Sequence, residues 1–183
     1  MPAHFDSPFV AHLEDLARRE DRGALAALRR GLGELPGACA DMHSYVVPFL
    51  GSGPWGWRRQ CHYIVAALFG LHPEPGRAGN MGSTFRAVAE AEKERTRGEI
   101  PQSIERRFVA LLKCHRDDLF DHLRQAVGLA RSKDASVDWH RLLYDVERWD
   151  SDDRWVQRDW AESFWGNPAG QKTNQDSEEG ADR

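Results

Sequence analysis

The spacing of the apolar residues is the feature that most constrains how this chain can fold. Apolar side chains recur at intervals of three and four residues along most of the sequence, as at Ile104, Phe108, Leu111 and Leu112. This spacing places them on one face of an α-helix, whereas a half-buried strand would alternate apolar and polar residues. No stretch alternates strictly over the length of a strand. The sequence therefore predicts an all-α protein.

Capping and turn residues divide this pattern into separate helices. Ser7 before Pro8 is typical of an N-cap and a first-turn proline, and Asp21 can cap a second helix that ends at Gly33. Ser151, followed by two aspartates, predicts the start of the final helix, because acidic residues favour the positive end of the helix dipole. The other expected helices cover about residues 40–50, 55–69, 83–97, 104–112, 119–130 and 139–146.

The breaks in the pattern indicate how the helices are grouped. We expect two packed helical bundles, an N-terminal one over residues 7–97 and a C-terminal one over residues 101–165, with a hinge between them. Residues 72–82 contain two prolines and three glycines, and we expect a loop of the length that often serves a function or moves. Residues 166–183 lack large apolar side chains and are predicted to form a disordered tail.

The length and composition are those of a soluble globular protein. With 183 residues, of which 40% are hydrophobic and 30% charged, the chain can bury a core of its own. It has no run of eighteen apolar residues, so we expect no membrane span, and its first twenty residues lack the apolar centre of a signal peptide. The three widely spaced cysteines suit a reducing compartment. We therefore expect a cytoplasmic location.

Charge is unevenly distributed along the chain, although the net charge is only −4. Residues 18–33 hold five arginines against two acidic residues, and residues 103–133 hold seven basic residues against four acidic ones. Between residues 138 and 165 the balance reverses, with eight acidic residues against four arginines. A local basic surface for nucleic acid is thus compatible with a chain that is acidic as a whole.

Catalytic and metal-binding motifs are not recognisable in the sequence. Cys61–His62 and Cys114–His115 are neighbours, but adjacent helical residues point about 100° apart, so neither pair can chelate a metal alone. The two pairs could still meet to form a Cys2His2 site. The carboxylates between residues 145 and 153 could serve a metal-dependent nuclease, although helix capping and solvation are their commoner use. We predict no catalytic residue, no metal and no cofactor.

Tryptophan is concentrated near the end of the chain, since five of the seven tryptophans lie between residues 139 and 165. Exposed aromatic side chains can stack on nucleic-acid bases, but tryptophans at helical spacing more often pack in a core. We expect them in the core or at a subunit interface.

Arginines and lysines at helical positions are the candidates for binding nucleic acid. At about 100° per residue, Arg124 and Arg131 lie about 80° and 60° from Arg116, on one flank of the same expected helix. This helix rises about 22 Å over the row, enough to reach several successive phosphates. Asp117 and Asp121 are close enough to neutralise part of the row. Charge and spacing also select Arg29, Arg30, Arg58, Arg59, Arg106, Arg107 and Lys133.

Three blocks of the sequence carry a family resemblance. They are ALAALRRG at residues 24–31, SIERRF at residues 103–108, and VDW at residues 137–139, the last followed by LL at 142–143 and RWD at 148–150. In their order and spacing, from about residue 22 to residue 165, they resemble the CasB family, the small subunit of the type I-E CRISPR Cascade complex.

The resemblance implies a fold, partners and binding residues. It implies an all-α protein of two bundles that pairs head-to-tail with a second copy, lies along the guide-bearing backbone of Cascade and touches the large subunit. The expected nucleic-acid partners are the crRNA and the target and non-target DNA strands, and no catalytic activity is expected. The residues carried over by the resemblance are Arg29, Arg30, Arg86, Arg106, Arg107, Arg116 and Arg124. Arg58, Arg59, Arg131 and Lys133 rest on charge and spacing alone.

The function we predict from the sequence is that of a supporting subunit. Base pairing reads the target in a guide-bearing complex, so such a subunit needs only contacts with the nucleic-acid backbone to stabilise the R-loop. A helical scaffold that contacts only protein subunits is the main alternative. A helical hydrolase that uses Asp145 and its neighbouring carboxylates is a further one, and a helix-turn-helix repressor is less favoured because no helix pair has a clear recognition helix.

Overall fold

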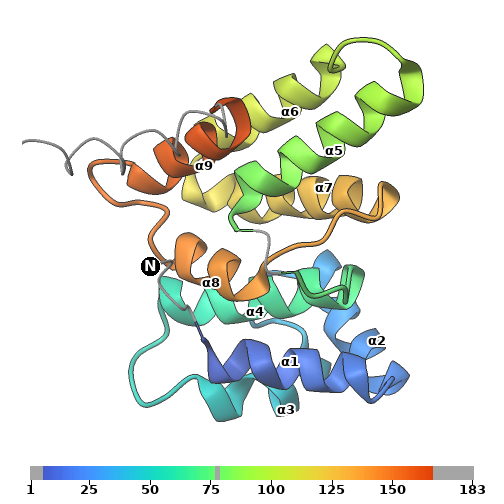
Figure 1. Ribbon diagram of the computed structural model, residues 1–183. Coiled ribbons are helices and arrows are strands. Elements are labelled where there is room, and N and C mark those ends of the chain that lie inside the picture. Colours follow the sequence, from blue (N-terminus) through green and yellow to red (C-terminus); the bar gives the residue numbers. More distant parts are fainter. Residues whose placement is uncertain (1–5, 77–78, 167–183) are drawn as a thin grey trace, which may run out of the picture.

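The computed structural model describes residues 6–76 and 79–166, which form helices joined by turns (Figure 1). The predicted all-α fold is confirmed, and an isolated parallel bridge joins Pro75 to Val137. The described helices are α1 (Pro8–Arg18), α2 (Arg22–Arg30), α3 (His43–Val46), α4 (Trp57–Leu71), α5 (Met81–Thr96), α6 (Gln102–Lys113), α7 (Leu119–Ser132), α8 (Trp139–Glu147) and α9 (Trp155–Trp165). The short 3-10 turns are η1 (Gly31–Gly33), η2 (Ala40–Met42), η3 (Val47–Phe49) and η4 (Arg116–Asp118).

The predicted N-caps Ser7 and Asp21 are confirmed, whereas the helix starts predicted at Ser83 and Ser151 are wrong. The Ser7 side chain accepts a hydrogen bond from the Val10 amide at 3.4 Å, and Asp21 caps α2 through the Ala24 amide at 2.9 Å. Ser151, however, does not cap the last helix, because the chain makes a further turn before α9 begins at Trp155. That turn ends at Arg154, whose φ of +51° lies in the left-handed region and breaks the helical path.

Helix α4 is the centre of the molecule. Its sequence CHYIVAALFG, at residues 61–70, is apolar on nearly every side, and all ten residues are buried. A helix that is apolar all round must be covered on every face. Helices α2, α7 and α8 pack against it, as Figure 1 shows for α2 and α8.

The tryptophans of the last third mostly fill the core, as the sequence predicted. Trp139, Trp149 and Trp160 are almost completely buried. Their indole N–H groups all find acceptors within the protein: the Glu74 carbonyl for Trp139, the Cys114 carbonyl for Trp149 and the Asp145 carboxylate for Trp160. Buried indoles need such partners, because an unpaired buried N–H costs free energy.

Helices of the two segments expected from the sequence pack against one another. Helix α5 packs on α9, and α8 packs on α4, so each segment supplies a helix to the other's layer. In Figure 1, α5, α6, α7 and α9 lie on one side of the molecule, and α1 to α4 lie with α8 on the other. The division between residues 7–97 and 101–165 stays a prediction, and α7 also contacts both α4 and α5 across it.

The expected loop over residues 72–82 is shorter than predicted, and its described residues His72 and Gly76 are hydrogen-bonded to the segment 135–137. Helix α4 extends to Leu71, and α5 begins at Met81, where the Asn80 side chain accepts from the Ser83 amide at 3.2 Å. The His72 Nε2 atom lies 2.8 Å from the Ala135 carbonyl oxygen, and the Gly76 amide donates to Val137 at 2.9 Å.

Two further sequence predictions concern the C-terminal tail and membrane-spanning helices. The predicted disordered tail lies outside the described residues beyond position 166. Among the helices of the described part, none combines the length and the apolar character that crossing a bilayer requires.

Candidate nucleic-acid interface

Ion pairs hold six of the eleven basic residues that the sequence selects. A guanidinium or ammonium paired with a carboxylate has less net charge to offer a phosphate, although exposed pairs of this kind add little to stability. The pairs are Arg30–Asp41 at 2.5 Å, Arg58–Glu147 at 3.2 Å, Arg86–Glu90 at 2.9 Å, Arg116–Asp150 at 3.0 Å, Arg124–Asp121 at 3.4 Å and Lys133–Glu92 at 2.6 Å.

The remaining five arginines have no carboxylate partner within residues 6–76 and 79–166. They are Arg29, Arg59, Arg106, Arg107 and Arg131, all at least partly exposed. Three of them donate to neutral oxygens: Arg29 to the Gly70 carbonyl at 2.8 Å, Arg59 to the Gly51 carbonyl at 2.8 Å, and Arg106 to the Gln102 side chain at 2.6 Å. Within the described residues, none of these five guanidinium groups is engaged in an ion pair.

Surface hollows bring some of the candidates together. Arg116 and Arg124 line a hollow of about 570 Å³ between the segment 32–36, α4 and α7. Arg58 and Arg59 line a second hollow of about 440 Å³ at the start of α4, and Trp57 belongs to both. A third hollow, of about 180 Å³, is lined by Arg107 and Lys133. Other candidates lie elsewhere, such as Arg86, which donates to the Gly166 carbonyl at the end of α9 at 2.5 Å.

The helical row predicted for Arg116, Arg124 and Arg131 is wrong at its first member. Arg116 lies in the 3-10 turn η4, and α7 begins only at Leu119, so Arg116 does not share the helix of the other two. Its guanidinium instead lies over the Trp57 ring, 5.3 Å from the ring centroid, and pairs with Asp150. Such stacking of a cation on an aromatic face is favourable, and it fixes both side chains.

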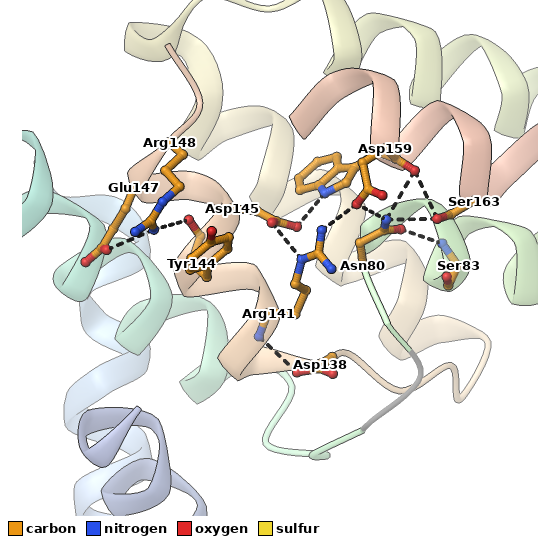
Figure 2. A network of polar contacts seen from close by, with 11 residues as sticks. Asn80, Ser83, Asp138, Arg141, Tyr144, Asp145, Glu147, Arg148, Asp159 and Ser163 are labelled. Carbon is orange, nitrogen blue, oxygen red and sulfur yellow. Dashed lines mark hydrogen bonds and ion pairs between the residues drawn. The ribbon is translucent and has the colours of Figure 1, made fainter. Parts of the chain in front are cut away.

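A buried polar network, which the sequence analysis did not identify, joins α8 to α9 and α5 (Figure 2). Arg141 pairs with Asp145 at 2.7 Å and also with Asp159, which accepts from the Asn80 side chain at 2.7 Å. Trp160 donates to the second oxygen of Asp145, also at 2.7 Å. The pair Arg141–Asp145 has the (i, i+4) spacing of a helix pair, which was the only signal in the sequence.

Burial governs the protonation of the network's central carboxyl. The Asp145 side chain is completely buried. Desolvation raises its pKa to about 6, while the hydrogen bonds from Trp160 and Arg141 act in the opposite direction. Through Arg141, Asp159 and Asn80, the Asp145 carboxyl is linked to α9 and to the start of α5 as well as to its own helix α8.

The carboxylates considered for a hydrolase point to separate basic partners. Asp145 faces Arg141, whereas Glu147 and Asp150 pair with arginines from α4 and η4. Within residues 6–76 and 79–166, no group of three or more His, Cys, Asp or Glu side chains is arranged to hold a metal ion. Burial also raises the pKa of the Cys61 thiol, and it raises that of Cys114 to about 11, so both thiols stay protonated at neutral pH.

Comparison with known proteins places the chain in a family. The model of the family described as CRISPR-associated protein Cse2 matches residues 24–165, which run from α2 to the end of α9. The chain belongs to the Cse2 family. A Cse2 protein of Thermus thermophilus is 41% identical over 144 residues, which are 78% of this chain and 79% of the relative. All eleven basic candidates lie inside the range that the Cse2 model matches, whereas α1 lies outside it.

Solved structures of Cse2 relatives have the same fold. The crystal structure of CasB from Thermus thermophilus matches with a TM-score of 0.72 and 35% identity, over 88% of this chain and 100% of that one. The expected relation to CasB is therefore confirmed. A chain in a structure described as a CRISPR RNA-guided surveillance complex matches with a TM-score of 0.66 and 26% identity, over 85% of this chain and 92% of that one.

Proposed function

We propose that this Cse2 protein is a non-catalytic small subunit of a cytoplasmic, Cascade-type CRISPR surveillance complex. In it, the subunit binds the backbone of the crRNA–target duplex and of the displaced DNA strand, and so stabilises the R-loop. The observation that carries the proposal is the match to a chain of an RNA-guided surveillance complex, together with the family assignment. The other Cascade subunits, and a second copy arranged head-to-tail, are its proposed protein partners.

The uncompensated arginines support the nucleic-acid part of the proposal. Arg29, Arg59, Arg106, Arg107 and Arg131 lie on four helices and form no ion pair with a carboxylate in the described part of the chain. Guanidinium groups recognise phosphate oxygens through charge-assisted hydrogen bonds. Among the candidates, these five are therefore better placed to bind a backbone than the six in ion pairs.

The energetics of R-loop formation explain why weak contacts would suffice. Exchanging a DNA duplex for an RNA–DNA duplex is close to balanced in free energy, so contacts of the protein with the backbone can decide the outcome. Such contacts carry no sequence information. A subunit without a base-reading surface can therefore control how long the target stays open.

Reversing the charge of Arg106 and Arg107 tests the proposal. The double variant Arg106→Glu/Arg107→Glu is assembled into the complete complex, and the lifetime of the R-loop on a cognate duplex is measured. We expect normal assembly and a lifetime shortened by about tenfold or more, because two backbone contacts become repulsive. The matched control is Arg18→Glu/Arg19→Glu at the C-terminal end of α1, where both arginines are already paired with Asp15. An unchanged R-loop in the first variant would contradict the nucleic-acid role.

A protein scaffold is the second candidate function, and the ion pairs favour it. Six of the eleven candidates are already paired with acidic side chains, as in a surface that does not contact nucleic acid. Under this alternative the Arg106→Glu/Arg107→Glu variant loses its place in the complex, and any complex that still forms opens DNA normally. The subunit stoichiometry of the purified complex separates the two functions.

A further inference from the structure

The hollow lined by Arg116 and Arg124 has an apolar floor. Ile64 is buried at its base, and Trp57 and Phe120 are half-buried in its walls. The Trp57 ring is held in position, since its indole nitrogen donates to the Val146 carbonyl at 2.9 Å. The hollow is therefore a fixed feature of the packed core surface, with a volume of about 570 Å³.

A strongly exposed apolar side chain lies at the rim of this hollow. Leu35 is 80% exposed, the most exposed large hydrophobic residue in the described part of the chain. Trp55 is 52% exposed and extends this apolar surface. Its ring packs over Gly37, which follows Leu35 by two residues. A Cβ at position 37 would lie 2.2 Å from this ring, so only glycine allows the close approach. Exposed apolar surface next to a hollow is typical of a binding site for another protein.

The charges around the hollow do not suit a phosphate. Its two arginines are both occupied: Arg116 by Asp150, and Arg124 by Asp121 and by the Leu32 carbonyl at 3.1 Å. Two further carboxylates line the hollow, those of Glu34 and Asp117. Neither has a lysine or arginine partner within the described residues, and Asp117 lies 3.4 Å from the Nδ1 atom of His115. After the internal pairing, the rim is therefore negative.

We propose that this hollow, with Leu35 at its rim, is a docking site for a protein segment that carries an apolar side chain flanked by lysine or arginine. The apolar side chain would enter the hollow over Ile64 and Trp57, and its basic neighbours would pair with Glu34 and Asp117. An apolar centre surrounded by complementary charges is the usual arrangement of a protein–protein interface. The site adds a protein-binding role to the nucleic-acid role, and it assigns Arg116 and Arg124 to the frame of that site.

A display experiment on the full chain tests this site without a known partner. A library of random twelve-residue peptides is selected on the wild-type protein and counter-selected on Leu35→Gln, whose side chain is too exposed to affect folding. We expect the enriched peptides to place an apolar residue next to lysine or arginine. The enriched peptide, made synthetically and followed by fluorescence anisotropy, should bind Leu35→Gln about tenfold more weakly or worse, as for an interface residue at the centre of a site.

Two control variants test the contribution of the rim carboxylates and the specificity for Leu35. The variant Glu34→Gln/Asp117→Asn should also weaken binding of the peptide, because it removes the two rim carboxylates that no lysine or arginine neutralises within the described residues. Ile100→Gln, which replaces another exposed apolar side chain between α5 and α6, should leave binding unchanged.

Several results would overturn the docking site, and they differ from a failure of the nucleic-acid role. Selection of acidic peptides, or of no peptide that depends on Leu35, would remove it. Displacement of the peptide by a twenty-nucleotide single-stranded DNA would show a nucleic-acid site instead. A lower molecular mass in solution for Leu35→Gln than for the wild type would show that a second copy covers the hollow. The R-loop lifetime of the Arg106→Glu/Arg107→Glu complex depends on none of these outcomes.

Discussion

The indole nitrogen of Trp160 donates to the carboxylate of Asp145 at 2.7 Å, and both side chains are completely buried. The bond joins α9 to α8, and thus one layer of helices to the other. Arg141 holds the other oxygen of the same carboxylate, and it also reaches Asp159 on α9. A carboxylate in this position is stable only because both of its oxygens are paired.

Removal of Arg141 should therefore be costly. Arg141→Leu leaves the Asp145 carboxylate buried without its countercharge, and we expect the free energy of unfolding to fall by about 3–5 kcal/mol. Replacing both partners, in Arg141→Leu/Asp145→Leu, should cost less than the single change, because no uncompensated charge remains. Urea unfolding followed by circular dichroism measures both. If Arg141→Leu lowered the free energy of unfolding no more than a variant that breaks the exposed Arg18–Asp15 pair, the role of Arg141 would be contradicted.

The raised pKa of Asp145 predicts how stability depends on pH. Its pKa is about 6 in the folded protein, against an ordinary value of 3.8, so the folded state binds the proton more tightly than the unfolded state. The contribution of the protonated group to stability is then complete below about pH 4 and is lost as the pH rises through about 6. The loss should be on the order of 3 kcal/mol. We expect the wild type to lose this stability relative to Asp145→Asn between pH 4 and 7. If the free energies of unfolding of the two proteins changed in parallel with pH, the raised pKa of Asp145 would be contradicted.

The contact between α5 and α9 depends on a glycine. A Cβ at Gly82 would lie 1.9 Å from the Trp160 carbonyl oxygen, a backbone atom that cannot move without shifting α9. We expect Gly82→Ala to destabilise the protein by about 1–3 kcal/mol or more, as overpacking does. Gly128→Ala is the matched control: it lies inside α7 with open space around it, and it should stabilise the protein by about 0.5–1 kcal/mol. Thermal unfolding of both variants checks that the changes in stability relative to the wild type have opposite signs.

Local features of the sequence predicted the helices well, because caps and apolar spacing act over a few residues. Asp21, for example, caps the helix that directly follows it. Ser151 failed as a cap because a competing turn, ending at Arg154 with positive φ, came between it and α9. Nothing in the adjacent residues distinguishes these two cases, since each has a capping residue before an apolar pattern.

The binding residues were harder to predict, because their partners come from distant parts of the chain. The pair Arg124–Asp121 follows from their spacing of three residues and was predictable from the sequence. Arg116, in contrast, pairs with Asp150, and Arg58 with Glu147, 89 residues away. Only the fold decides which acidic residue meets which arginine, so the sequence could select basic candidates but could not separate the free ones from the paired ones.

The uncompensated arginines should govern how DNA binding depends on salt. In Arg106→Gln/Arg107→Gln, we expect the plot of log affinity against log salt to become less steep by about 0.9 for each phosphate contact that is lost. The isolated full chain, titrated with a duplex between about 50 and 200 mM salt, provides the measurement. Arg18→Gln/Arg19→Gln should leave the slope unchanged, because both guanidinium groups are held in ion pairs with the Asp15 carboxylate. Scrambling the DNA sequence should have little effect, since backbone contacts do not read bases. A wild-type affinity that does not change with salt would exclude phosphate contacts as the source of binding.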